Sequence, residues 1–194
     1  RFVEMGAHHD VGLEGISAAA KRRLVAELSR DAAVYVSTER GIPADLDAQQ
    51  IPVPPALMHD LLSEASLFVT DSNTMATEAG LLGTPTVRSG AYAETNEFSN
   101  FDVLFEAGLV ESIAEEDRAV DRALELFEDP DAGRRWRQRR DAYVADKPDL
   151  TEYIVETVLA VAGGGPPERD ASVSRQNPGG DRAVQAVPRR EGDD

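Results

Sequence analysis

Short apolar runs alternate along most of the chain with stretches that repeat apolar residues at helical spacing. The runs predict strands over residues 1–6, 33–36, 67–69 and 86–88. The stretches between and after them predict helices over residues 17–29, 55–65, 73–83, 115–128, 131–146 and 149–162, with Pro130 and Pro148 at two of the boundaries. Strands that alternate with helices predict an α/β fold, a doubly wound parallel sheet in a Rossmann-like domain over residues 1–162.

Three other segments are predicted to lack regular structure. Residues 37–50 are rich in turn formers and predict a linker, and the polar residues 89–102 predict a long loop. Residues 163–194 are rich in Gly, Pro, Arg, Asp and Ser without apolar periodicity, which predicts a disordered tail. Because the chain starts at Arg1 inside a predicted strand and without a methionine, we expect it to be a fragment.

The most informative stretch runs from Leu67 to Pro85. A buried strand leads into the polar turn Asp71-Ser72-Asn73-Thr74, and a helix then runs to Gly83. Backbone N–H groups at a helix N-terminus lack intrahelical partners and the helix dipole favours negative charge, so this turn predicts a phosphate site. Glu78, one turn in, can accept hydrogen bonds from ribose hydroxyls. The alternative is an ordinary helix that Ser72 or Asn73 merely caps.

The composition excludes several classes of function. With 36 acidic and 20 basic residues the net charge is −16, which disfavours binding to nucleic acid. A dense carboxylate surface with only two lysines is typical of halophilic proteins, although acidity for solubility explains it equally well. The arginine-rich run 134–140 predicts a solvated face or a contact with an acidic partner rather than a nucleic-acid patch.

The chain has no cysteine, and its three histidines are few for a metal site, so neither a metal nor another cofactor is expected. No apolar run approaches the roughly 20 residues that a transmembrane helix requires. No signal peptide is visible either, so we expect a cytoplasmic protein without stable membrane insertion.

Several motifs carry a resemblance to known families. Thr70-Asp71-Ser72, Glu78-Ala79 and Gly83-Thr84-Pro85 resemble the nucleotide-sugar site in the carboxyl-terminal domain of the GT-B superfamily, in particular the non-hydrolysing UDP-N-acetylglucosamine 2-epimerases. The chain is most similar to the carboxyl-terminal half of the archaeal and bacterial family DUF354, related to those epimerases and to glycosyltransferases. The further motifs that it shares with DUF354 are Gly6-Ala7-His8-His9-Asp10, Ser37-Thr38-Glu39-Arg40 and Pro54 to Leu62.

The resemblance implies a set of residues that bind a nucleotide diphosphate sugar, most plausibly a UDP-sugar. Ser72, Asn73 and Thr74 would donate to the diphosphate and Glu78 would bind the ribose. The loops after the first and third strands share the binding edge of the sheet, so His9 is a further candidate for a phosphate contact, with Asp10 orienting it; both can instead be ordinary polar loop residues. His59, on the helix before the signature strand, would lie near the base and ribose. The alternative is that His59 is a half-buried histidine within a helix that forms a hydrogen bond with a carbonyl group.

The chain also departs from the epimerase pattern. Asn73 and Thr74 stand where the epimerases have two glycines, and the loop at His8-His9-Asp10 lacks the arginine, glutamate and asparagine of the epimerase motif. These departures favour a glycosyltransferase or an unassigned activity in the synthesis of surface polysaccharides or glycoconjugates. No catalytic residue can be named, because the epimerases take their catalytic carboxylates mainly from an upstream domain. The resemblance permits a homodimer, and the alternative function is a non-catalytic nucleotide-sugar-binding or assembly domain.

Overall fold

The computed structural model describes residues 1–2, 15–38, 44–46, 48–90, 99–145 and 147–163. The chain divides into two compact units, Arg1–Lys147 and Pro148–Asp194, which are described separately. The predicted tail, residues 163–194, lies outside the described residues except for Gly163.

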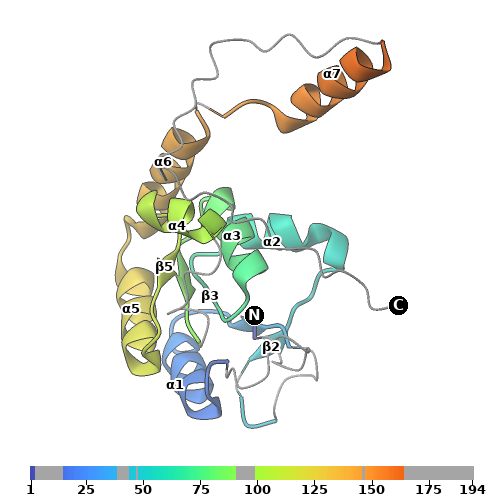
Figure 1. Ribbon diagram of the computed structural model, residues 1–194. Helices are drawn as coiled ribbons and strands as arrows, with labels where there is room; N and C mark the ends of the chain where they lie inside the picture. Colours follow the sequence, from blue (N-terminus) through green and yellow to red (C-terminus); the bar gives the residue numbers. More distant parts are fainter. Residues whose placement is uncertain (3–14, 39–43, 47, 91–98, 146, 164–194) are drawn as a thin grey trace, which may run out of the picture. The chain divides into compact units, whose positions relative to one another are not determined.

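The first unit alternates strands and helices, as the hydrophobic pattern predicts (Figure 1). Its elements are α1 (Ala18–Leu28), β1 (Tyr35–Val36), β2 (Gln49–Gln50), a 3-10 turn (Pro55–Leu57), α2 (Met58–Glu64), β3 (Phe68–Thr70), α3 (Asn73–Leu82), β4 (Thr86–Arg88), α4 (Ser99–Glu106), β5 (Glu111–Ser112), α5 (Glu116–Glu128) and α6 (Ala132–Val144).

All strand pairs are parallel. β3 pairs with β4 from Phe68 opposite Thr86 to Thr70 opposite Arg88, β4 pairs with β5, and β1 pairs with β2. Arg1 and Phe2 lie between the two groups of strands: the Phe2 N–H donates to the Ser37 carbonyl at 2.9 Å, and the Arg1 amino group donates to the Val69 carbonyl at 3.0 Å.

The resulting order across the molecule is β2, β1, the segment Arg1–Phe2, β3, β4, β5. Counted along the chain, this is the order of a doubly wound dinucleotide-binding sheet. It confirms the predicted fold class. In such a sheet ligands bind outside the carboxyl ends of the strands, which here are the ends at Ser37, Thr70 and Arg88.

The helices cover the sheet on both faces (Figure 1). α1 and α5 pack against each other and, with Trp136 of α6, enclose the larger apolar cluster around the fully buried Val87 of β4. On the other face α3 packs against β3, β4, α2 and α4, and its Ala76 belongs to a second cluster with Leu104, Leu109 and Val110.

Side-chain capping explains where α1 and α3 begin. Ser17 is extended and its side chain accepts the Ala20 N–H at 3.2 Å, which starts α1. Ser72 does the same for α3, where its Oγ accepts the Met75 N–H at 3.4 Å. Gly83 ends α3 with φ of 86°, a left-handed conformation that glycine adopts without steric cost.

β5 lies outside the predicted strands, and two stretches predicted to lack regular structure contain an element. The predicted linker contains β2, because Gln49 donates its N–H to the Val34 carbonyl at 2.8 Å and so extends the edge of the sheet. The predicted loop 89–102 ends in a helix: α4 begins at Ser99, and Leu104 buries its side chain beside α3. Both errors arise because contacts distant in sequence stabilise short segments with weak local signals.

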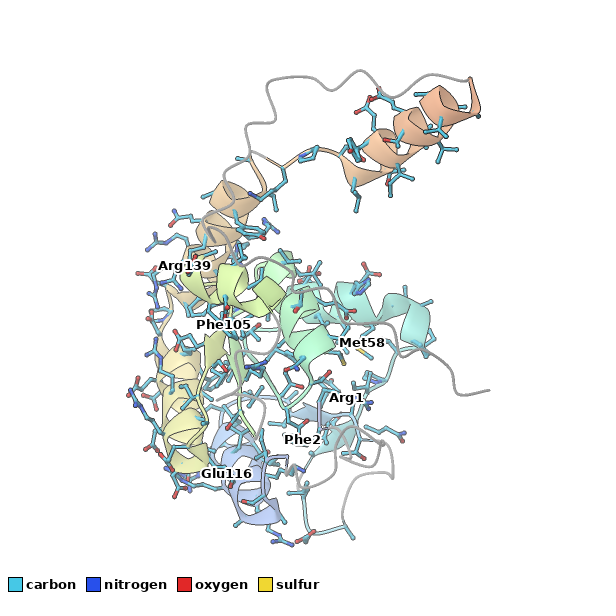
Figure 2. The ribbon with its side chains drawn as sticks, in the orientation of Figure 1. Arg1, Phe2, Met58, Phe105, Glu116 and Arg139 are labelled. Carbon is cyan, nitrogen blue, oxygen red and sulfur yellow. The ribbon has the colours of Figure 1, made fainter. Side chains whose placement is uncertain are left out.

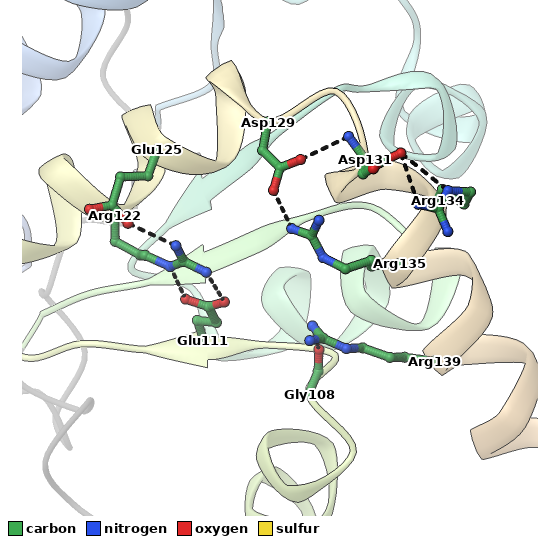
Figure 3. A network of polar contacts seen from close by, with 9 residues as sticks. All are labelled: Gly108, Glu111, Arg122, Glu125, Asp129, Asp131, Arg134, Arg135 and Arg139. Atoms are coloured by element: carbon green, nitrogen blue, oxygen red, sulfur yellow. Dashed lines mark hydrogen bonds and ion pairs between the residues drawn. The ribbon is translucent and has the colours of Figure 1, made fainter.

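The arginine-rich run on α6 mostly makes contacts within the chain. Arg134 pairs with Asp131 and Arg135 with Asp129, as Figure 3 shows. Trp136 is 1% exposed and donates its Nε1–H to the Leu109 carbonyl at 2.9 Å. The interpretation as a solvated face is therefore correct for Arg134, which is half exposed, and wrong for Trp136.

Two further arginines of the run tie α6 to other elements, Arg139 to the segment after α4 and Arg140 to the end of α3. Arg139 donates to the Gly108 carbonyl at 2.9 Å, and Arg140 donates to the Leu82 carbonyl at 3.1 Å, at the end of α3. Cations near the last carbonyls of a helix are favourable because these carbonyls lack intrahelical donors. These contacts help to fix α3 relative to the core.

The second unit contains α7 (Leu150–Ala162), as predicted, with Asp149 accepting N–H groups from Thr151 and Glu152 as its N-cap. Its apolar side chains are largely exposed, Leu159 and Leu150 by 66% and 64%.

Candidate functional site

The turn between β3 and α3 is held by its own hydroxyl groups. Thr70 Oγ1 accepts the Ser72 N–H at 2.9 Å and donates to the Arg1 carbonyl at 2.7 Å. Buried Asp71 accepts the Ile16 N–H at 3.3 Å through Oδ2, which ties the turn to the start of α1. These contacts fix the direction in which α3 leaves the sheet.

The first two backbone N–H groups of α3, those of Asn73 and Thr74, indicate an anion-binding site. Ser72 uses its side chain to cap the Met75 N–H, as the alternative reading of this turn expected. Within the described residues, however, the N–H groups of Asn73 and Thr74 donate to no protein acceptor. Two unused donors at the positive end of a ten-residue helix can bind a phosphate group, so capping and anion binding are compatible here.

Arg88 places a positive charge beside this turn. It is the last residue of β4 and is only 3% exposed. Its Nη1 donates to Asn73 Oδ1 at 2.5 Å, and its Nε and Nη2 donate to Ser112 Oγ at 3.1 and 2.8 Å. Its guanidinium also lies 5.1 Å from the centre of the ring of Phe105, which α4 carries (Figure 2).

Burial lowers the pKa of the Arg88 guanidinium below its ordinary value, because desolvation disfavours the charged form. Arginine still stays protonated in proteins, so Arg88 raises the positive potential at the α3 N-terminus. Arg88 is not among the site residues that the sequence predicts. The available signal was a charged side chain at the end of a predicted core strand, on the edge of the sheet where ligands bind.

Ser89 follows Arg88 and adds a hydroxyl group at the same edge. Its N–H donates to the Thr70 carbonyl at 3.0 Å, directly before the turn. Its side chain is 3% exposed, and Ser89 Oγ has no hydrogen-bond partner within the described part of the chain. A buried hydroxyl without a partner is costly. Successive side chains of a strand alternate between faces, so Ser89 follows Arg88 on the opposite face and adds no donor at Asn73.

The structure brings together two residues that the sequence places 19 positions apart. His59 of α2 and Glu78 of α3 lie with Nε2 and Oε2 3.5 Å apart, and their side chains are 66% and 36% exposed. Glu78 and Thr74 stand four residues apart on one face of α3. Glu78 is about 7 Å along the helix axis from Asn73, a distance suited to a group next to a bound diphosphate.

The remaining predicted site residues, His9 and Asp10, lie outside the described residues. Ser72, Asn73, Thr74 and Glu78 thus share α3, and His59 joins them through Glu78.

A cavity of about 360 Å³ is lined by none of the predicted site residues. Its lining is mainly apolar and comes from α1, α2, β1, β3 and Met75 of α3. An apolar lining offers few donors for a phosphate, so this cavity is not the site suggested by the sequence.

Within the described ranges, no three His, Asp or Glu side chains gather as a metal site would require. None of the helices in that part of the chain combines the length and apolar character needed to cross a bilayer.

Comparison with known proteins supports the fold. No family model matches the chain, so membership of DUF354 stays a prediction, and no curated protein matches it in sequence. Among solved structures, a protein described as a UDP-N-acetylglucosamine 2-epimerase from Listeria monocytogenes superposes with a TM-score of 0.54 at 15% identity. This match covers 87% of the present chain and 46% of the Listeria protein.

A second structure, described as the glycotransferase of kitacinnamycin, matches with a TM-score of 0.49 at 19% identity over 74% of the present chain. The chain spans 38% of the length of that protein, so it corresponds to less than half of either structure. At 15% identity the likeness to the Listeria protein shows the fold alone, a Rossmann-like domain.

Proposed function

We propose that this domain binds the diphosphate and ribose of a nucleotide sugar, a UDP-sugar, as the nucleotide-binding half of a GT-B glycosyltransferase or a 2-epimerase-like enzyme. The observation that carries the proposal is the α3 N-terminus, where the unused N–H groups of Asn73 and Thr74 lie beside buried Arg88 at the carboxyl edge of a parallel sheet. The pathway that we propose is the synthesis of surface polysaccharides or glycoconjugates.

The charges at the site suit this chemistry. In sugar transfer, and in the elimination that an epimerase performs, the nucleotide diphosphate departs and gains negative charge. Preorganised N–H donors and a fixed positive charge stabilise such a charge without reorganising during the reaction. The helix N-terminus and Arg88 supply both, while Glu78 lies further along α3 beside His59 of α2, where a ribose would follow.

The catalytic groups themselves are proposed to lie outside this chain. The chain spans 46% of the Listeria protein, and its described residues supply binding groups around α3. We therefore expect the isolated domain to bind a nucleotide sugar without turning it over.

The proposal is tested by calorimetry and thermal shift with UDP, UDP-N-acetylglucosamine, GDP and dTDP in buffers of low and molar salt. Selective stabilisation by one diphosphate supports the site and identifies the base. Binding of none of them to the folded protein contradicts the proposal and makes the turn at Ser72 a purely structural cap.

A variant of Glu78 tests the ribose assignment separately. Glu78→Ala should weaken UDP binding by about 1–3 kcal/mol, the range for leaving hydrogen-bonding groups without partners. Asp60→Ala is the matched control, because it removes an exposed carboxylate from α2 next to His59 without touching Glu78. Equal UDP affinity in both variants would exclude Glu78 from the ribose site.

A further inference from the structure

The contact between Arg88 and Asn73 determines which end of the Asn73 amide faces outward. A guanidinium has only donors, so the group that meets Arg88 Nη1 at 2.5 Å must be the amide oxygen. The Asn73 NH2 group therefore points away from Arg88. This NH2 group adds side-chain donors at Asn73, the first residue of α3. The unused backbone N–H groups of Asn73 and Thr74 lie at the same end of the helix.

Arg88 is itself held in place, so it can fix the orientation of Asn73. Two of its nitrogens donate to Ser112 Oγ, its guanidinium lies against the Phe105 ring, and burial leaves it 3% exposed. A planar guanidinium with contacts on several sides has little freedom to rotate. An amide that binds to it loses the freedom to flip between its donor and acceptor ends.

We propose that the Asn73 NH2 group donates to the phosphate of the bound nucleotide, and that Arg88 is a positioning residue that presents this donor. The inference rests on the proposed function and deepens it, because it names a side chain that distinguishes an anionic ligand from a neutral one.

Asn73→Asp tests the inference sharply. The aspartate keeps the shape and can still accept from Arg88, but it replaces the outward donor with an oxygen that repels phosphate. A carboxylate at the first position of a helix and beside an arginine is also favourable, so the thermal midpoint should hold or rise. We expect UDP affinity to fall at least tenfold while uridine, which lacks phosphate, binds as tightly as before.

A double-mutant cycle separates positioning from general stability. Arg88→Lys keeps the charge but cannot hold Ser112 and Asn73 together. If Arg88 acts through Asn73, Arg88→Lys should weaken UDP binding severalfold in the native background and have no further effect when Asn73 is already alanine. The melting of each variant is recorded to show that it is folded.

The outcomes are distinguishable by calorimetry. If the native protein binds UDP and Asn73→Asp binds it within twofold, the inference is wrong and the proposed function stands. Additive effects of Arg88→Lys and Asn73→Ala would overturn the positioning role of Arg88. If the native protein binds no nucleotide diphosphate, the proposed function and this inference fail together.

Discussion

Gly80 allows α3 to pack closely on the segment before β5, and an alanine there should destabilise the protein. A Cβ added at Gly80 would lie 2.7 Å from the Leu109 carbonyl oxygen and 3.0 Å from Val110 Cγ2, well inside the 3.4 Å at which ordinary contact begins. The nearest atom belongs to the backbone, and Trp136 also donates to this carbonyl. The Leu109 backbone therefore cannot yield as a flexible side chain would.

The magnitude follows from two opposing effects. Overpacking a well-packed interior costs about 1–3 kcal/mol. Alanine gains about 0.5–1 kcal/mol over glycine within a helix. We therefore expect Gly80→Ala to lower the free energy of unfolding by about 1–2 kcal/mol, which lowers the thermal midpoint by about 2–8 °C in a protein of this size.

The assay is urea unfolding followed by circular dichroism, with Gly133→Ala as the control. Gly133 also lies in a helix, but a Cβ there would meet only the end of the Arg137 side chain, with Nη1 at 3.2 Å. Gly133→Ala should be neutral or slightly stabilising. If Gly80→Ala is as stable as Gly133→Ala, α3 does not pack against Leu109 as described, and the placement of the candidate site on α3 loses its support.

Two further predictions concern α6 and the acidic loop before it. Trp136→Phe removes the donor to the buried Leu109 carbonyl and should destabilise the protein by about 1–3 kcal/mol in urea unfolding; unchanged stability would show that this hydrogen bond contributes nothing. Arg135 holds the pKa of the Asp129 carboxyl below its ordinary 3.8. The stability that this ion pair contributes is present above pH 3.8 and is lost as the pH falls through the lower pKa of the folded state. Asp129→Asn should therefore melt earlier than the native protein near pH 6, and the difference should shrink as the pH falls below 3.8. A difference independent of pH would refute this ion pair.

Local signals were strong enough to predict most elements of the fold. Ser17, Ser72 and Gly83 mark the ends of α1 and α3 because capping depends on a few neighbouring residues. β2 and the start of α4 were missed, since their short segments are stabilised mainly by partners distant in sequence. Arg88 was missed for the same reason: its value to the site lies in its contact with Asn73, 15 residues earlier.

Local patterns along the chain establish the alternation of strands and helices, and hence a parallel α/β domain with a polar turn at a helix N-terminus. Periodicity, caps and breakers act within a few residues of one another, so they can be read along the chain. Packing of the helices on the sheet brings His59 to Glu78 and Arg88 to Asn73, and it pairs arginines of α6 within the chain. These pairings join separate elements, and their geometry exists only once the helices have packed on the sheet.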